Sequence, residues 1–146
     1  MTDSKPEPLN IQGPMCPVPH HHTEAVMLGH GSGGQMTQDL IANVFQAQLG
    51  NAFLAEGNDA ARIHLDGMEG KIAISTDSHV VSPLFYPGGD IGRLAVCGTV
   101  NDVAMLGARP LYLTAGFILE EGFPMADLEK VIASMAAACQ EAGVQI

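Results

Sequence analysis

The chain has 146 residues, with 16 Asp and Glu against 6 Lys and Arg, and therefore a formal net charge of −10. This length fits one domain with its own core and is too short for two full domains. Hydrophobic residues make up 47% and charged residues 15%, which argues against intrinsic disorder. The acidity weighs against general binding to nucleic acids or anionic membranes. A phosphate-bearing ligand would therefore depend on backbone N–H groups or on metal ions bridging to carboxylates.

The sequence is typical of a cytoplasmic protein. No apolar run reaches the roughly 20 residues that span a bilayer, and no basic stretch followed by an apolar one marks a signal peptide. The three cysteines, Cys16, Cys97 and Cys139, lack CxxC spacing, which argues against a disulfide framework and a zinc site. We expect Cys97 and Cys139 to serve as buried small hydrophobic residues.

Residues 1–24 carry five of the nine prolines and a run of three histidines, and we predict a flexible leader there. A short apolar run at 25–28 then leads into the glycine-rich segment 29–34. Apolar residues at helical spacing follow as far as Leu49, and Gly50 stands where a helix C-cap glycine belongs.

Two β-rich runs, 62–65 and 71–76, flank an Asp-Gly pair and predict a hairpin. We predict a second helix over about 90–106 and a strand over 111–119. Pro124 suits the first turn of a third helix, which Gly143 would end. Residues 144–146 resemble the beginning of a further strand, so we expect the chain to be part of a longer protein.

The glycine-rich segment matches G-x-G-x-x-G, and Glu56 follows about 20 residues later, which is the dinucleotide-binding fingerprint. The preceding strand is short, however, and a hairpin before the second helix does not belong to a βαβαβ unit. We therefore expect phosphate contact without NAD, or simply a mobile turn. A P-loop is excluded because no G-x-x-x-x-G-K-[ST] segment occurs. The candidate phosphate-binding residues are His30, Gly31, Ser32, Gly33 and Gly34.

Carboxylates form the second candidate site. Asp77 follows the strand 72–76, and Asp90 opens the second helix, where it could simply be an N-cap. Asn101 and Asp102 lie in a helix that is apolar nearly all round, so we expect them to be buried. A buried carboxylate needs a cation or hydrogen bonds, which predicts either an Mg²⁺ site, with Asp59 as a further ligand, or an Asp bonded to a loop backbone.

His79 stands two residues after Asp77, so alternation along a strand would place both side chains on one face. This spacing allows a His/Asp metal pair, but no third His or Cys lies nearby. A polar residue at a strand end is the simpler interpretation.

Four segments together resemble the HypE family of hydrogenase maturation proteins: 30–34 (HGSGG), 75–78 (STDS), 88–95 (GGDIGRLA) and 98–110 (GTVNDVAMLGARP). That family belongs to the aminoimidazole-ribonucleotide-synthetase-like, or PurM-like, ATP-binding superfamily, with selenophosphate synthetase and thiamine-monophosphate kinase. The resemblance covers about 25–146, and its specific part is 88–110.

The resemblance implies an α/β, PurM-like N-terminal domain in 25–146, with a mixed four-stranded sheet and helices on one face. Sheets from two copies would pair into a β-barrel across a homodimer, and ATP and Mg²⁺ would bind in a cleft shaped by both. It implies Asp59, Asp77 and Asp102 as metal or phosphate ligands, supported by Asp90 and Asn101. Asn58 replaces an acidic residue of the superfamily segment beside Asp59.

The implied activity is that of a carbamoyl dehydratase. ATP activates a thiocarboxamide on the protein's own C-terminal cysteine, and loss of phosphate leaves a thiocyanate, the source of cyanide ligands for nickel–iron hydrogenase. Implied partners are the carbamoyltransferase HypF and the HypC–HypD complex.

The family's C-terminal domain and terminal cysteine are absent from these 146 residues, and Cys139, inside a helix pattern, cannot replace that cysteine. We therefore expect an N-terminal domain that dimerises and binds nucleotide without turnover. A dimerisation and docking module and another ATP-dependent member of the superfamily are the alternatives. Strands 72–76 and 111–119, apolar on both faces, also predict a homodimer.

Overall fold

The computed structural model describes residues 24–58, 60–64, 67 and 70–146. Of the predicted leader only Glu24 is described, and Asp59 lies outside the described residues, as does Asp66 of the predicted hairpin turn. The elements in chain order are η1 (Leu28–Gly31, a 3-10 turn), α1 (Gln35–Leu40), η2 (Ile41–Gln46, π-helical), α2 (Ala47–Leu49), α3 (Ala52–Ala55), β1 (Phe85–Tyr86), β2 (Gly89–Asp90), α4 (Ile91–Met105) and α5 (Met125–Ala142).

The first predicted helix is confirmed, since α1, η2 and α2 follow one another without a break. Gly50 ends it for a steric reason: a Cβ there would come within 2.5 Å of the Gln46 carbonyl oxygen. The apolar run before it is not the predicted strand. Only Ala25 pairs, in one antiparallel bridge with Pro124, and the chain turns into η1 at Leu28.

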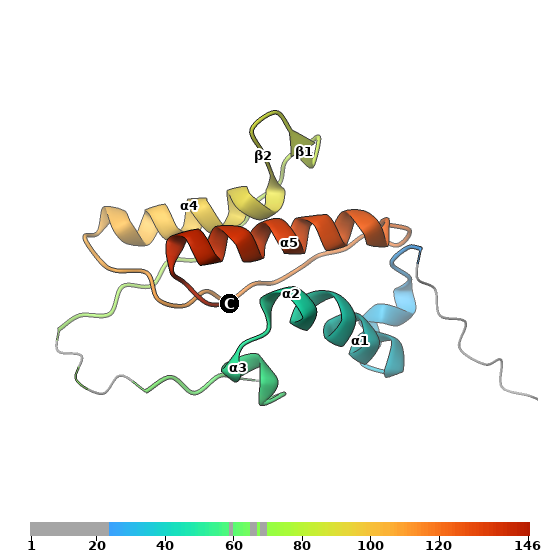
Figure 1. Cartoon of the computed structure of the whole chain (residues 1–146), viewed down its shortest axis with the longest axis horizontal. Helices are drawn as coiled ribbons and strands as arrows, with labels where there is room; N and C mark the ends of the chain where they lie inside the picture. The colour runs from blue at the N-terminus through green and yellow to red at the C-terminus, as the bar shows by residue number, and fades with distance from the viewer. Residues whose placement is uncertain (1–23, 59, 65–66, 68–69) are drawn as a thin grey trace, which may run out of the picture.

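The two later helices are also confirmed, and their capping residues explain their bounds. The Asp90 side chain accepts hydrogen bonds from the backbone N–H groups of Gly92 and Arg93 at the start of α4. Helix α5 follows Pro124 and ends at Gly143, whose φ of 68° is in the left-handed region that favours glycine. The two helices lie side by side and run in the same direction (Figure 1).

Helix α5 lies at the centre of the core. It packs against α4 on one side and against the helix formed by α1, η2 and α2 on the other (Figure 1). Cys139 is buried as expected, whereas Cys97 is only half-buried. The buried hydrophobic side chains are those of Val26, Leu40, Val44, Val96, Met125, Leu128, Val131, Ile132, Met135, Ala138, Cys139 and Val144.

The predicted sheet is largely missing from the described residues. There, β1 and β2 form a two-stranded antiparallel ladder, Phe85 opposite Asp90 and Tyr86 opposite Gly89. The described parts of the predicted hairpin, 62–64 and 71–76, pair with no strand, and the predicted strand 111–119 contributes one bridge. Alternating apolar residues suit a sheet face, but backbone pairing also needs a neighbouring strand, and among the described residues 62–64 and 71–76 have none beside them.

The one bridge from 111–119 joins Tyr112 to Gln145 in a parallel arrangement. The N–H of Leu113 donates to the Gln145 carbonyl at 2.7 Å, and the N–H of Gln145 donates to the Leu111 carbonyl at 3.1 Å. Tyr112 and Gln145 are therefore joined through α5 in the manner of a βαβ crossover. Within the described residues, no helix combines the length and apolar character needed to cross a bilayer.

Candidate functional site

The segment 75–79 lies along α4 and brings Asp77 close to the helix that carries Asp102. Ser75 Oγ donates to Asp102 Oδ2 at 3.4 Å. A Cβ placed on Gly98 would lie 3.6 Å from Asp77 Oδ2, so Asp77 lies beside the helix turn that precedes Asp102.

The geometry of the two backbones explains this match. Two residues of extended chain advance about 6.6 Å, and four residues of α-helix advance about 6 Å. Ser75 and Asp77 can therefore face successive turns of α4, at Asp102 and at Gly98. The alternation of the strand-like segment puts His79 on the same face, and its ring also lies against Gly98. The segment runs antiparallel to the helix.

His79 contacts both Asp77 and Gly98. Its Nε2 lies 3.1 Å from Asp77 Oδ2, and the His79 side chain is 15% exposed against 36% for Asp77. The sequence spacing suggested this pair only weakly. The additional signal was Gly98, because a glycine in a helix interior marks a place where another group approaches closely.

Asn101 and Asp102 are exposed, so the prediction that they are buried is wrong. The apolar pattern all round α4 was misleading. Its buried residues, Gly92 and Val96, lie in the first half of the helix. Met105, at the end of the helix, is 84% exposed. Solvent therefore stabilises the Asp102 carboxylate in this chain, and burial gives no argument for a compensating cation.

Asp90 has a structural role that its position as an N-cap suggested. Its Oδ1 accepts from the N–H of Gly92 at 2.7 Å and from that of Arg93 at 3.1 Å. Its Oδ2 accepts from Ser134 Oγ at 2.6 Å. Both oxygens are thus engaged within the protein, so Asp90 holds the start of α4 in place.

Hydrogen bonds within the glycine-rich loop 29–34 and to the residues beside it hold the loop in one conformation. His30 Nδ1 accepts from the N–H of Met27 at 2.8 Å, and Ser32 Oγ donates to the Gly29 carbonyl at 2.7 Å. Thr37 Oγ1 accepts from the N–H of Gly33 at 2.9 Å and donates to the His30 carbonyl at 2.6 Å. In this conformation the Gly33 N–H, a candidate phosphate donor, is already used.

The loop and the carboxylates form two separate groups in this chain. Figure 1 shows η1 beside the start of α5, well away from the second half of α4, where Asp102 lies. The structure therefore brings Asp77, Asn101 and Asp102 to one region and leaves residues 30–34 in another. Among the described residues, no three His, Cys, Asp or Glu side chains group closely enough to hold a metal by themselves.

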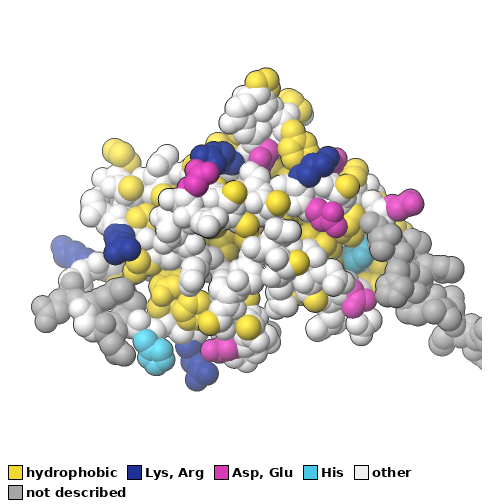
Figure 2. Space-filling model, in the orientation of Figure 1, with side chains coloured by type: hydrophobic (Ala, Val, Ile, Leu, Met, Phe, Trp, Pro, Cys, Tyr) yellow, Lys and Arg dark blue, Asp and Glu magenta, His cyan; other side chains and the backbone are white. Residues whose placement is uncertain are grey.

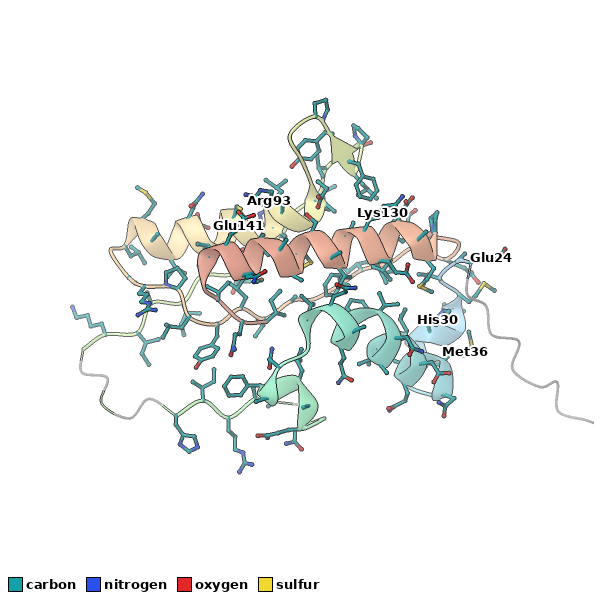
Figure 3. All side chains as sticks on the ribbon, in the orientation of Figure 1. Glu24, His30, Met36, Arg93, Lys130 and Glu141 are labelled. Atoms are coloured by element: carbon teal, nitrogen blue, oxygen red, sulfur yellow. The ribbon has the colours of Figure 1, made fainter. Side chains whose placement is uncertain are left out.

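Charges near α4 are paired instead of clustered. Arg93 donates two hydrogen bonds to Glu141, from Nη1 to Oε1 at 2.9 Å and from Nη2 to Oε2 at 2.6 Å (Figure 3). These bonds lower the pKa of Glu141 and raise that of Arg93. Figure 2 shows dark blue and magenta side chains next to each other over the helices, with the remaining dark blue ones near the edges of the visible face. On that face no basic patch is available to hold phosphate.

Comparisons with known proteins agree on one family. The family model described as "AIR synthase related protein, N-terminal domain" matches residues 57–146, which include the segment 75–79 and all of α4 and α5. The hydrogenase expression/formation protein HupE of Azotobacter chroococcum mcd 1 is 58% identical over 122 residues, which are 84% of this chain and 35% of that protein. The carbamoyl dehydratase HypE of Azotobacter vinelandii is 57% identical over 122 residues, with the same shares.

A solved structure gives the same result in three dimensions. The crystal structure of hydrogenase maturation protein HypE in complex with ATP aligns with a TM-score of 0.78 and 56% sequence identity, over 82% of this chain and 35% of that one. The chain thus spans about a third of the length of the curated relatives it matches.

Proposed function

Because the chain belongs to the family of AIR synthase related proteins, through the N-terminal domain that matches 57–146, we propose that it is the ATP-binding domain of a carbamoyl dehydratase in hydrogenase maturation. The observation that carries this proposal is the alignment of 75–79 along α4, which brings Asp77 and Asp102 to one side of the helix. The likeness to an ATP-bound HypE, at 56% identity, supports the nucleotide as ligand.

The two carboxylates suit Mg²⁺, since this ion usually takes one or two protein carboxylates and completes its shell with phosphate oxygens and water. Asp102 is exposed, and Asp77 is partly exposed, so both are open to a nucleotide. Asp77 and Asp102 would hold the ion, and Asn101 lies beside them on α4. When bound, Mg²⁺ neutralises charge on the transferred phosphoryl group. Asp59 stays a predicted further ligand, outside the described residues.

The reaction of the longer protein would use this domain to present the nucleotide. The oxygen of a thiocarboxamide on a C-terminal cysteine attacks the γ-phosphorus of ATP, and ADP leaves. Loss of phosphate and of the nitrogen-bound protons then leaves a thiocyanate on the same sulfur. In this scheme the present residues bind and orient ATP, while the cysteine belongs to a part of the protein outside these 146 residues, which by themselves would not turn over. HypF and the HypC–HypD complex would be its maturation partners.

A second copy of the chain is part of this proposal. Residues 30–34 lie away from Asp77 and Asp102, which supports a nucleotide cleft that one copy does not complete alone. The exposed apolar side chains of Ile72, Ile74 and Val80, which are 72%, 84% and 96% exposed, offer a surface for that copy. The same surface favours the alternative function, a dimerisation and docking module without nucleotide binding.

Calorimetric titration of Mg-ATP separates the two functions. We expect the chain to bind Mg-ATP and the Asp102→Ala variant to bind at least about tenfold more weakly, because a direct ligand is lost. Asp39→Ala, which removes a partly exposed carboxylate on α1, is the matched control and should bind as the unaltered chain does. Absence of binding by the unaltered chain would reject the nucleotide function and leave the docking module.

A further inference from the structure

The imidazole of His79 occupies a place that a glycine in α4 leaves free. A Cβ on Gly98 would come to 2.7 Å from His79 Nε2 and 3.5 Å from Cε1. Any larger residue at position 98 would therefore push the ring away from the helix. Glycine is unfavourable in a helix interior relative to alanine, so its presence here is consistent with a requirement for that space.

The ring in turn faces the carboxylate of Asp77. His79 Nε2 lies 3.1 Å from Oδ2, and the N–H of Ser78 donates to Oδ1 at 2.8 Å. Both oxygens of Asp77 thus have a partner inside the segment. An ionised carboxylate offers about four acceptor positions, so room remains on it for a cation. The two partners restrict its rotation without occupying it fully.

We propose that His79 is a positioning residue for the metal–nucleotide site, and that Gly98 leaves the space that the His79 ring occupies. The inference rests on the proposed function of Asp77 as a ligand of Mg-ATP. His79 acts through Asp77, holding the carboxylate toward the side of α4 on which Asp102 lies. Partners of this kind, outside the ligands themselves, typically change metal affinity by about ten- to a hundredfold.

The first experiment replaces the imidazole by side chains of similar length. His79→Leu removes the nitrogen and keeps an apolar side chain against Gly98, whereas His79→Gln retains an N–H that can reach Asp77. Calorimetric titration of Mn-ATP into each variant gives the affinity for the metal–nucleotide complex. We expect about a tenfold loss for His79→Leu and recovery of most of it for His79→Gln. His64→Leu, at an exposed histidine, is the matched control and should change nothing.

The second experiment uses Gly98 to test the spatial argument. Gly98→Ala should weaken metal binding about as much as His79→Leu does, because the added Cβ displaces the ring. In a chain that already carries His79→Ala, Gly98→Ala should cause no further loss, since no imidazole is left to displace. This non-additivity is the signature of two residues that act as a unit, and a general loss of folding would not produce it. Thermal unfolding of each variant identifies any that fail to fold.

The outcomes separate this inference from the proposed function. If the unaltered chain binds no Mn-ATP, the proposed function fails and the inference fails with it. If the chain binds and His79→Leu binds equally well, the inference alone is overturned. Full additivity of His79→Ala and Gly98→Ala would also overturn it, because the two residues would then act separately.

Discussion

Asp90 and Ser134 join the first turn of α4 to the middle of α5 through a hydrogen bond of 2.6 Å between Ser134 Oγ and Asp90 Oδ2. The other oxygen of Asp90 caps α4, so one carboxylate both begins a helix and attaches it to its neighbour. Tyr86 Oη donates to the backbone carbonyl of Asp90 at 3.2 Å and brings the β1–β2 hairpin to the same point. This junction sets where α4 starts and, through α4, where Asp102 lies.

Asp90→Ala should therefore destabilise the fold clearly. Loss of an N-cap costs about 0.5–2 kcal/mol, and the hydrogen bond from Ser134 contributes about 1 kcal/mol more. Urea unfolding measures the difference in unfolding free energy. Ser134→Ala should show the smaller part of the loss, and Glu129→Ala, which removes an exposed carboxylate of α5, almost none. Equal stability of Asp90→Ala and the unaltered chain would contradict this account of the junction.

Gly92→Ala tests the close contact between α4 and α5. A Cβ there would collide with the Val131 carbonyl oxygen and lie 2.9 Å from Met135 Cγ. An alanine normally favours a helix by about 1 kcal/mol over glycine, yet here overpacking should destabilise by about 1–3 kcal/mol. The measurement is the midpoint of thermal or urea unfolding. Ala104→Gly, at an exposed position of α4, calibrates the helix effect alone, and a stabilised Gly92→Ala would refute the close contact.

The pair Arg93 and Glu141 should give a pH-dependent contribution to stability. The hydrogen bonds from Arg93 lower the pKa of Glu141 below its ordinary value near 4.5. A lowered folded-state pKa stabilises the fold above the ordinary value, and this contribution disappears as pH falls through the lower one. The stability gap between the unaltered chain and Glu141→Gln should thus be present at pH 7 and close toward pH 3. Both side chains are exposed, so salt should narrow the gap as well.

The control for that measurement is Glu129→Gln, which alters another exposed carboxylate of α5. Its stability difference should not follow the same pH course. A gap for Glu141→Gln that stays constant from pH 7 to pH 3 would show that the pair does not contribute through its charge.

Ile74→Asp should weaken self-association. The side chain is 84% exposed in the segment 71–81, between Ile72 and Val80, which are also exposed. We expect the unaltered chain to sediment as a dimer at micromolar concentration and the variant to shift toward monomer, because burying a carboxylate against an apolar partner is costly. Leu106→Asp, at a 73% exposed position directly after α4, is the control for a general effect of added charge. A stable monomer of the unaltered chain would contradict the prediction.

Local sequence signals were sufficient for the helices. Capping by Asp90, the position of Pro124 and the left-handed Gly143 act within a turn of the helix they bound, so the bounds of α4 and α5 could be predicted closely. The strands could not, because pairing depends on residues far away in sequence. Apolar alternation in 71–76 predicts that one face of this segment is buried. It does not identify the strand, or the second chain, that buries it.

The same contrast between local and long-range interactions applies to the predicted site residues. The sequence correctly suggested an N-cap for Asp90, since that role is local. The prediction that Asp102 is buried was wrong. An apolar helix indicates that other elements pack on it, but it does not show that those elements belong to this chain. The contact of His79 with Gly98 required the register between an extended segment and a helix, and only the three-dimensional structure reveals it.

The equal advance of two extended residues and one helix turn has a consequence for how the segment 75–79 can change in length. Inserting or deleting one residue between Ser75 and His79 would reverse the side-chain alternation on one side of the change. Ser75 could no longer face Asp102 while His79 faces Gly98. A single substitution alters one of these contacts, whereas an insertion or deletion of one residue would break both at once. Changes in length are therefore poorly tolerated along these five residues.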